Sequence, residues 1–223
     1  YTATPFANVF MHHEARSNLI NDKLKTVIGE DLFPRSFIIN IPAPSNYIGP
    51  EKVFGLERPA SGDEARGLPI ITKVDDAEGV FPLKHKKTLA VHAIPGTLRT
   101  SVLIFFLVCA ARRARGDVRV HNSMLVHVTR FTDVQAQVAR LLDEELQDCR
   151  RQLEYEGAGG SLRDELERLW QEEFAPKFGT LSDAFPLDDL PSIQWNDVER
   201  QLFDAVKRIT VRTINVSAKE ALD

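Results

Sequence analysis

The chain has 223 residues, of which 43% are hydrophobic and 27% charged, and its net charge is −4. These values are typical of a soluble globular protein, and they exclude binding of a polyanion by bulk charge alone. The longest apolar run, residues 102–111, is too short to span a bilayer, and no secretory signal is recognisable. Cys109 and Cys149 predict buried free thiols in a reducing compartment. We therefore expect a cytoplasmic protein without a membrane partner.

The N-terminal third contains one predicted strand and a long irregular region. Ser36–Ile41 is a short apolar run rich in β-branched residues, which Pro42 ends. Residues 46–50 predict a turn. Residues 56–96 are rich in proline, glycine and charge without a sustained period, so we expect an irregular connection or insertion there.

Helical patterns alternate with extended ones after this connection. Residues 97–115 predict a helix that is apolar on all sides in its middle and is therefore buried, with Gly116 as its stop. Residues 123–128, apolar on both faces, predict a central parallel strand. A capping box, Thr132-Asp133-Val134-Gln135, predicts a second helix that runs to about Arg151.

The remaining elements complete an α/β order. Two further helices are predicted over residues 162–174 and 195–208, the latter with Asn196 as its cap, before a closing strand over 209–216. Helices and apolar strands in this order indicate a fold with a parallel sheet flanked by helices.

Charge is unevenly distributed along the chain. From Lys84 to Arg130 there are nine basic residues and one acid, Asp117, whereas from Leu141 to Glu173 eleven acids face four arginines. A basic tract beside an acidic one indicates a surface that faces a polyanion next to a solvated surface. The alternative is that the two tracts pair with each other.

Catalytic motifs are not found in this sequence. It contains no phosphate-binding loop of the Gly-x-x-x-x-Gly-Lys-Ser/Thr type, no Asp-Glu pair that ends an apolar strand and no nuclease core with an acid two residues before a lysine. The histidines and cysteines lack metal-ligand spacing, so no catalytic or metal-binding residue is assigned. His127, inside a predicted strand, is either a core histidine or a residue near a ligand at the strand end.

Four segments in order carry a resemblance to a known family. They are Tyr1-Thr2-Ala3-Thr4-Pro5-Phe6-Ala7-Asn8, Asp31–Arg35, Pro44-Ser45-Asn46-Tyr47-Ile48-Gly49 and Ser123–Gln135. Together they resemble the bacterial Z-one (Z1) domain family, described as candidate endonucleases. The resemblance implies a superfamily-two helicase-like motor associated with restriction, DNA repair or phage defence.

The resemblance also implies roles for individual residues. Thr2, Ala3, Thr4 and Pro5 look like the helicase motif that couples the nucleotide site to nucleic-acid binding. The segment from Met124 to Arg130 looks like the strand and turn that contact a nucleic-acid backbone. Together with the basic tract, this gives six candidate DNA-binding residues: Arg112, Arg113, Arg115, His127, Thr129 and Arg130.

The expected architecture is an α/β, RecA-like parallel-sheet lobe with flanking helices. Residues 1–45 would end a first lobe, 46–96 connect, and 97–223 begin a second lobe with a helical insertion. The expected function is a central fragment of an ATP-dependent DNA-acting motor or endonuclease, with ATP and magnesium as cofactors of the parent protein. This chain alone, which lacks the phosphate loop, would bind neither cofactor and would hydrolyse no ATP. The alternative is a non-catalytic docking or scaffold domain that binds DNA or a partner protein.

Overall fold

The structure is a computed structural model that describes residues 18–21, 24–26, 39, 41, 44, 47–55, 67–155, 160–177, 181 and 192–214. The chain divides into two compact units, Tyr1–Tyr47 and Ile48–Asp223. In the first unit, β1 (Asn18–Asn21) and β2 (Leu24–Thr26) pair antiparallel, with Asn18 opposite Thr26 and an irregularity between Leu19 and Asn21. The predicted coupling motif, Thr2 to Pro5, lies outside the described residues.

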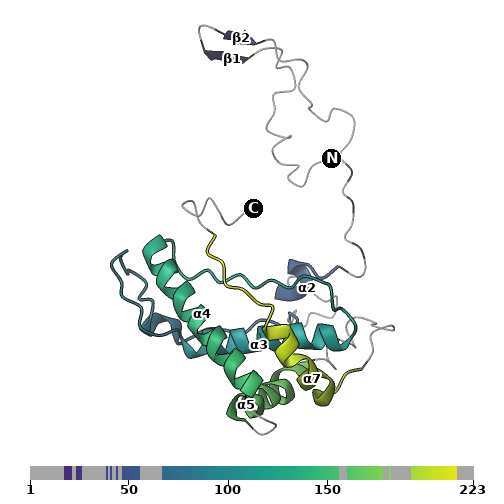
Figure 1. Cartoon of the computed structure of the whole chain (residues 1–223). Helices are drawn as coiled ribbons and strands as arrows, with labels where there is room; N and C mark the ends of the chain where they lie inside the picture. Colours follow the sequence, from purple (N-terminus) through teal and green to yellow (C-terminus); the bar gives the residue numbers. More distant parts are fainter. Residues whose placement is uncertain are drawn as a thin grey trace. The chain divides into compact units, whose positions relative to one another are not determined.

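The second unit is built from helices (Figure 1). Its long elements are α3 (Gly96–Ala114), α4 (Thr132–Tyr155), α5 (Ser161–Leu169) and α7 (Trp195–Val206). Shorter ones are α2 (Pro50–Phe54), the 3₁₀ turn η1 (Ala77–Gly79) and the π-helical turn η2 (Trp170–Phe174). The four predicted helices of this region are therefore confirmed, with ends that shift by a few residues.

The core explains why these sequences are helical. The buried face of α4 repeats every three or four residues, which is the helical period, and α3 buries residues around most of its circumference. Helix α3 packs most extensively on α7, and α5 contacts both α3 and α4. The largest fully buried side chains are Phe106, Leu103, Leu107, Leu146, Leu166 and Leu202.

Two helix starts differ from prediction in their chemistry. The Gln135 side chain donates to the carbonyl of Thr129, whereas in the predicted capping box it would accept from the backbone N–H of Thr132. At α7, the capping box is formed by Gln194 and Asp197, so the N-cap lies two positions before the proposed cap, Asn196. The stop of α3 is as predicted, because Gly116 takes φ +103° and its N–H bonds back to Arg113.

The predicted RecA-like parallel sheet is wrong. Within the described part of 97–223 there is no strand, and the strands of the chain that are described form the antiparallel hairpin of the first unit. Residues 123–128 and 209–214 are extended but lack ladder hydrogen bonds to any described residue, and 215–216 lie outside the description. Of the strand predicted at 36–41, Ile39 and Ile41 are described, and neither is in a strand.

The predicted three-part division, with boundaries at 45/46 and 96/97, stays a prediction. The central strand predicted at 123–128 is wrong: the segment is extended but belongs to no described sheet, because strand pairing depends on which neighbours are present and a local pattern does not contain that information. Both extended segments lie on the helical layer and border a common cleft. Neither has a described strand beside it, and so neither is part of a sheet.

Candidate nucleic-acid interface

A loop that precedes α3 is fixed to the N-terminal end of α4. Gln137 of α4 accepts a hydrogen bond from the backbone N–H of Val91 at 2.9 Å and donates one to the carbonyl of Leu89 at 3.0 Å. Val91 is buried in the core. One amide side chain thus satisfies a donor and an acceptor of the loop and orients the whole segment 82–91 against the helix.

His85 makes the second attachment of this loop. Its Nδ1 lies 2.8 Å from the carbonyl oxygen of Pro82 and its Nε2 lies 2.8 Å from Oγ1 of Thr129. Because a carbonyl can only accept, Nδ1 carries a proton. Thr129 is 6% exposed, and its Oγ1 also accepts from the N–H of Phe131 at 3.2 Å. The ring of Phe131 packs edge-on against His85 at 5.5 Å.

These attachments bring four cations into one neighbourhood. Lys84, Lys86 and Lys87 are exposed on either side of His85, and Arg130 directly follows Thr129 with its guanidinium 5.1 Å from the centre of the Phe131 ring. We call Lys84, Lys86, Lys87 and Arg130 the lysine-loop surface. Among the described residues, none of the four forms an ion pair with an acid. Asp133, in the first turn of α4, is an exposed acid nearby in the sequence.

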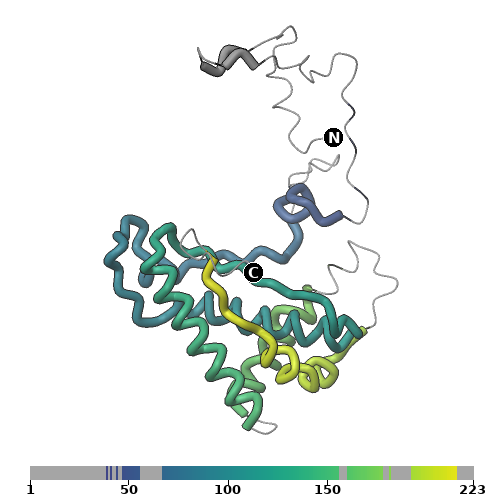
Figure 2. The backbone as a smooth tube through the Cα atoms, turned by 45° about the horizontal axis from the view of Figure 1, so that its top comes forward, coloured from purple at the N-terminus to yellow at the C-terminus, as the bar shows by residue number. Residues whose placement is uncertain are grey.

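The arginines at the end of α3 have a different environment. Arg112 pairs with Asp117 at 3.4 Å and donates to Asn122 at 2.6 Å. Arg113, whose side chain is 10% exposed, donates to the carbonyl of Val118 and lies 3.9 Å from Asp204. Burial lowers the pKa of Arg115. Figures 1 and 2 place the C-terminal end of α3 and the 82–91 loop on opposite sides of the helical unit.

The structure therefore divides the six predicted DNA-binding residues. Arg130 joins the lysines of the loop, and Thr129 is buried beneath them as an anchor. His127 is exposed on the extended segment and lines the cleft, while Arg112 and Arg113 are held by acids of their own surroundings. Sequence analysis did not assign His85 and Gln137, although a histidine between lysines was visible, because their partners lie more than forty residues away.

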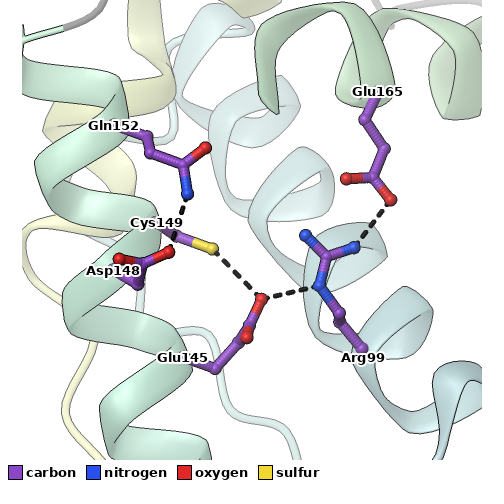
Figure 3. A network of polar contacts seen from close by, with 6 residues as sticks. All are labelled: Arg99, Glu145, Asp148, Cys149, Gln152 and Glu165. Carbon is purple, nitrogen blue, oxygen red and sulfur yellow. Dashed lines mark hydrogen bonds and ion pairs between the residues drawn. The ribbon is translucent and has the colours of Figure 1, made fainter. Parts of the chain in front are cut away.

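Part of the basic tract pairs with the acidic tract, as the alternative interpretation predicted. Arg99 of α3 bonds to Glu145 of α4 and to Glu165 of α5, each at 2.7 Å (Figure 3). The bond to Glu165 is the main cause that raises the pKa of Arg99, so this side chain is charged throughout the accessible pH range. Asp148 and Gln152 extend the polar contacts along α4.

The two cysteines are buried free thiols, as predicted. Burial raises the pKa of Cys109 to about 11 and that of Cys149 to about 12. Since the thiolate is the nucleophile, neither residue is suited to nucleophilic chemistry near neutral pH. In the described part of the chain, no group of three His, Cys, Asp or Glu residues could hold a metal ion.

Every helix in the described ranges is too short or too polar to cross a bilayer.

Comparison with known proteins identifies the family of this chain. No curated protein and no solved structure matches the chain. The model of the Z1 domain matches residues 97–223, which is more than half of the chain and includes α3, α4, α5 and α7. The chain belongs to the Z1 domain family.

Proposed function

We propose that the lysine-loop surface binds the phosphate backbone of DNA. The observation that carries the proposal is that His85 and Gln137 attach the segment with Lys84, Lys86 and Lys87 to the start of α4, beside Arg130, while none of these four cations has a described acidic partner. Lysine ammonium groups and an arginine guanidinium are the usual partners of phosphate oxygens. Holding them in place before binding reduces the entropy lost on association.

The long helix α4 adds to this surface. Its first turn directly follows Arg130 and Phe131, and the N-terminus of a helix carries partial positive charge. No described acid neutralises the four cations, whereas Arg112 and Arg113 are neutralised by Asp117 and Asp204. We therefore assign the principal contact to the lysine loop and a lesser one to the end of α3.

Backbone contact predicts a specific binding behaviour. If all four cations contact phosphates of duplex DNA, the logarithm of the binding constant falls with the logarithm of salt concentration with a slope of roughly −3 to −4. Little preference for sequence follows, because phosphates are the same at every base pair.

Fluorescence anisotropy with a labelled duplex tests this assignment. The variant Lys84→Gln/Lys86→Gln/Lys87→Gln/Arg130→Gln is expected to bind at least tenfold more weakly at low salt and to lose most of the salt slope. A control with the same change in net charge replaces four exposed cations that pair with acids three or four positions away in the sequence, Arg140→Gln/Arg151→Gln/Arg200→Gln/Lys207→Gln.

The control is expected to retain wild-type binding. Equal losses in the two variants would show that bulk charge, and not this surface, determines binding. Unchanged binding in the lysine-loop variant would contradict the proposal. Arg112→Gln is expected to have a smaller effect than Arg130→Gln, because Asp117 already neutralises Arg112.

The resemblance extends this proposal to the parent protein. An ATP-dependent motor or an endonuclease in restriction, repair or phage defence would use such a surface to hold DNA while chemistry occurs elsewhere. Release of phosphate that depends on both DNA and magnesium, measured on the full-length protein, tests the motor. Conversion of supercoiled plasmid to nicked or linear forms tests the endonuclease.

A further inference from the structure

A cleft of about 950 Å³ separates two extended segments of the helical unit. One border is residues 122–128, between α3 and α4, and the other is residues 209–214, after α7. We call them the two edge segments. Figure 2 shows them as teal and yellow stretches of tube that both run over the helices. The lysine-loop surface is not part of the lining of this cleft.

Both edge segments have the exposure pattern of strands with one covered face. In the first, half-buried Met124, Val126 and Val128 alternate with exposed Ser123, Leu125 and His127. In the second, half-buried Ile209, Val211 and Thr213 alternate with exposed Thr210, Arg212 and Ile214. A period of two means that each backbone is extended and turns one row of side chains onto the helices.

Apart from Ile209, whose N–H bonds to Val206 and whose carbonyl accepts from Arg150, the backbone groups of the edge segments are unpaired within the described chain. Residues 119–128 and 210–214 make no backbone-to-backbone hydrogen bond with any described residue. An extended segment with free N–H and C=O groups is a template for another strand. Two such segments on either side of one cleft offer hydrogen bonds to both edges of a single inserted strand.

The floor and rim of the cleft define what that strand carries. Apolar side chains of α3 and α4 form the floor: Phe105 and Ala139 are half-buried there, and Val102, Phe106, Val138, Leu142 and Leu146 are buried beneath them. The charged residues of the lining are four arginines and one acid: Arg113, Arg119, Arg208, Arg212 and Asp117. An occupant complementary to both is apolar on its inner face and acidic on its outer face.

We propose that this cleft docks an extended strand of a partner protein, with apolar residues at alternate positions and acidic residues between them. Backbone hydrogen bonds to the edge segments hold the strand, as in β-strand addition, and the apolar floor selects its inward side chains. Nucleic acid does not match this surface, because it offers no row of amide donors and carbonyl acceptors at strand spacing. The proposal does not depend on the lysine-loop surface.

The test uses the whole chain and a synthetic peptide, acetyl-Ser-Val-Asp-Ile-Glu-Val-Asp-Ile-Ser-amide. The control peptide has the same sequence but carries N-methyl groups at every second residue. Methylation removes the N–H donors along one edge of the peptide and leaves its charge and side chains unchanged. We expect saturable binding of the first peptide and at least tenfold weaker binding of the second. Amide hydrogen exchange is expected to slow at alternate residues of both edge segments.

A charge swap gives a second readout that does not require a core substitution. Arg208→Glu/Arg212→Glu is expected to bind the acidic peptide at least tenfold more weakly and to bind a version with lysine in place of its acids more tightly. Arg140→Glu/Arg151→Glu, on the exposed side of α4, serves as the matched control. It is expected to bind the acidic peptide and the lysine peptide as the wild type does.

Three results would overturn the proposal. One is the absence of peptide binding by the wild-type chain. Another is equal binding of the methylated and unmethylated peptides, since side chains alone would then account for it. The third is slower exchange in the edge segments on addition of a duplex oligonucleotide but not of the peptide, which would assign the cleft to nucleic acid.

Discussion

Thr129 is the buried polar side chain on which the proposed DNA surface depends. Its hydroxyl group is within hydrogen-bond distance of His85 and accepts from the N–H of Phe131, so it joins the 82–91 loop to the start of α4. Buried polar groups that lose a partner cost more free energy than a formed hydrogen bond contributes. The anchor is therefore sensitive to removal although it makes no direct contact with DNA in our proposal.

Replacing the anchor tests this reading. Thr129→Val retains the shape of the side chain but removes the hydroxyl group, so the N–H of Phe131 loses its acceptor and Nε2 of His85 loses its hydrogen-bond partner. We expect the free energy of unfolding to fall by about 1–3 kcal/mol, measured by urea denaturation. Thr88→Val, at an exposed position of the same region, should change it by less than about 0.5 kcal/mol. Equal effects would contradict an anchoring role.

Asp76 is the residue that fixes the first turn of α3 from a distance of 21 positions in the sequence. Its carboxylate accepts from the hydroxyl and from the backbone N–H of Thr97, the latter at 2.9 Å. These bonds, that of the hydroxyl first, lower the pKa of Asp76 below its usual value. A depressed pKa stabilises the fold above the unfolded pKa, near 4, and this stabilisation disappears as pH falls through the folded value.

The pH dependence of stability tests this contribution. Asp76→Asn is expected to unfold at lower urea concentration than the wild type at pH 7. The difference should narrow as the pH falls below 4, because the wild-type carboxyl then becomes neutral as well. Asp75→Asn, at the exposed neighbouring position, is the control and should show no such pH-dependent difference. A gap between Asp76→Asn and wild type that stays constant from pH 7 to pH 2 would rule out the ionised carboxylate as the cause.

At the scale of elements, the helices are joined by packing and by ion pairs: Arg113–Asp204 and Arg163–Glu199 each join α7 to one other helix, and Arg99 contacts two helices at once. Arg99 links α3 to α4 and α5 through Glu145 and Glu165, as Figure 3 shows, and these two side chains are 24% and 28% exposed. Four other ion pairs of this unit join exposed side chains three or four positions apart in the sequence. Exposed pairs contribute little to stability, so the Arg99 tie stands apart from them.

Two arginine-to-methionine substitutions compare the Arg99 ion pairs between helices with an exposed ion pair within one helix. Arg99→Met removes a guanidinium between two partly buried carboxylates, and we expect a loss of about 1–2 kcal/mol in the free energy of unfolding. Arg140→Met removes the exposed partner of Glu144, and we expect a change below about 0.5 kcal/mol. Thermal unfolding followed by circular dichroism measures both. A larger loss for Arg140→Met would refute the assignment.

At the scale of the whole molecule, Ile48–Asp223 forms one compact unit around one continuous core. Trp170 in η2 and Trp195 in α7 belong to that core, each 8% exposed, although 25 residues separate them. A single core of this kind predicts cooperative unfolding, in which local probes report the same transition.

Single-tryptophan variants examine that cooperativity. Trp170→Phe leaves Trp195 as the fluorescent probe, and Trp195→Phe leaves Trp170. In each variant we expect the urea midpoint from tryptophan fluorescence to coincide with that from far-ultraviolet circular dichroism. Separate fluorescence and dichroism midpoints within one variant would show that η2 or α7 unfolds as an independent unit.

The sequence by itself determined the helices and the family. Val134, Val138, Leu142 and Leu146 mark α4 because a helical period is a local property that each segment carries in its own residues. The stop at Gly116 was readable for the same reason. The resemblance named the Z1 domain, and the family match over 97–223 includes one of its four segments, Ser123–Gln135. Buried cysteines followed from their positions in helical patterns.

Tertiary structure alone decided whether the extended segments pair into a sheet and which basic residues lie near one another. Residues 123–128 are apolar and extended as expected, yet a strand becomes part of a sheet only beside a partner, and the described chain supplies none. Lys84 and Arg130 stand 46 positions apart, and His85, Thr129 and Gln137 join their segments through hydrogen bonds that no local pattern encodes. Pairings between distant residues depend on the folded chain, because only there do their donors and acceptors meet.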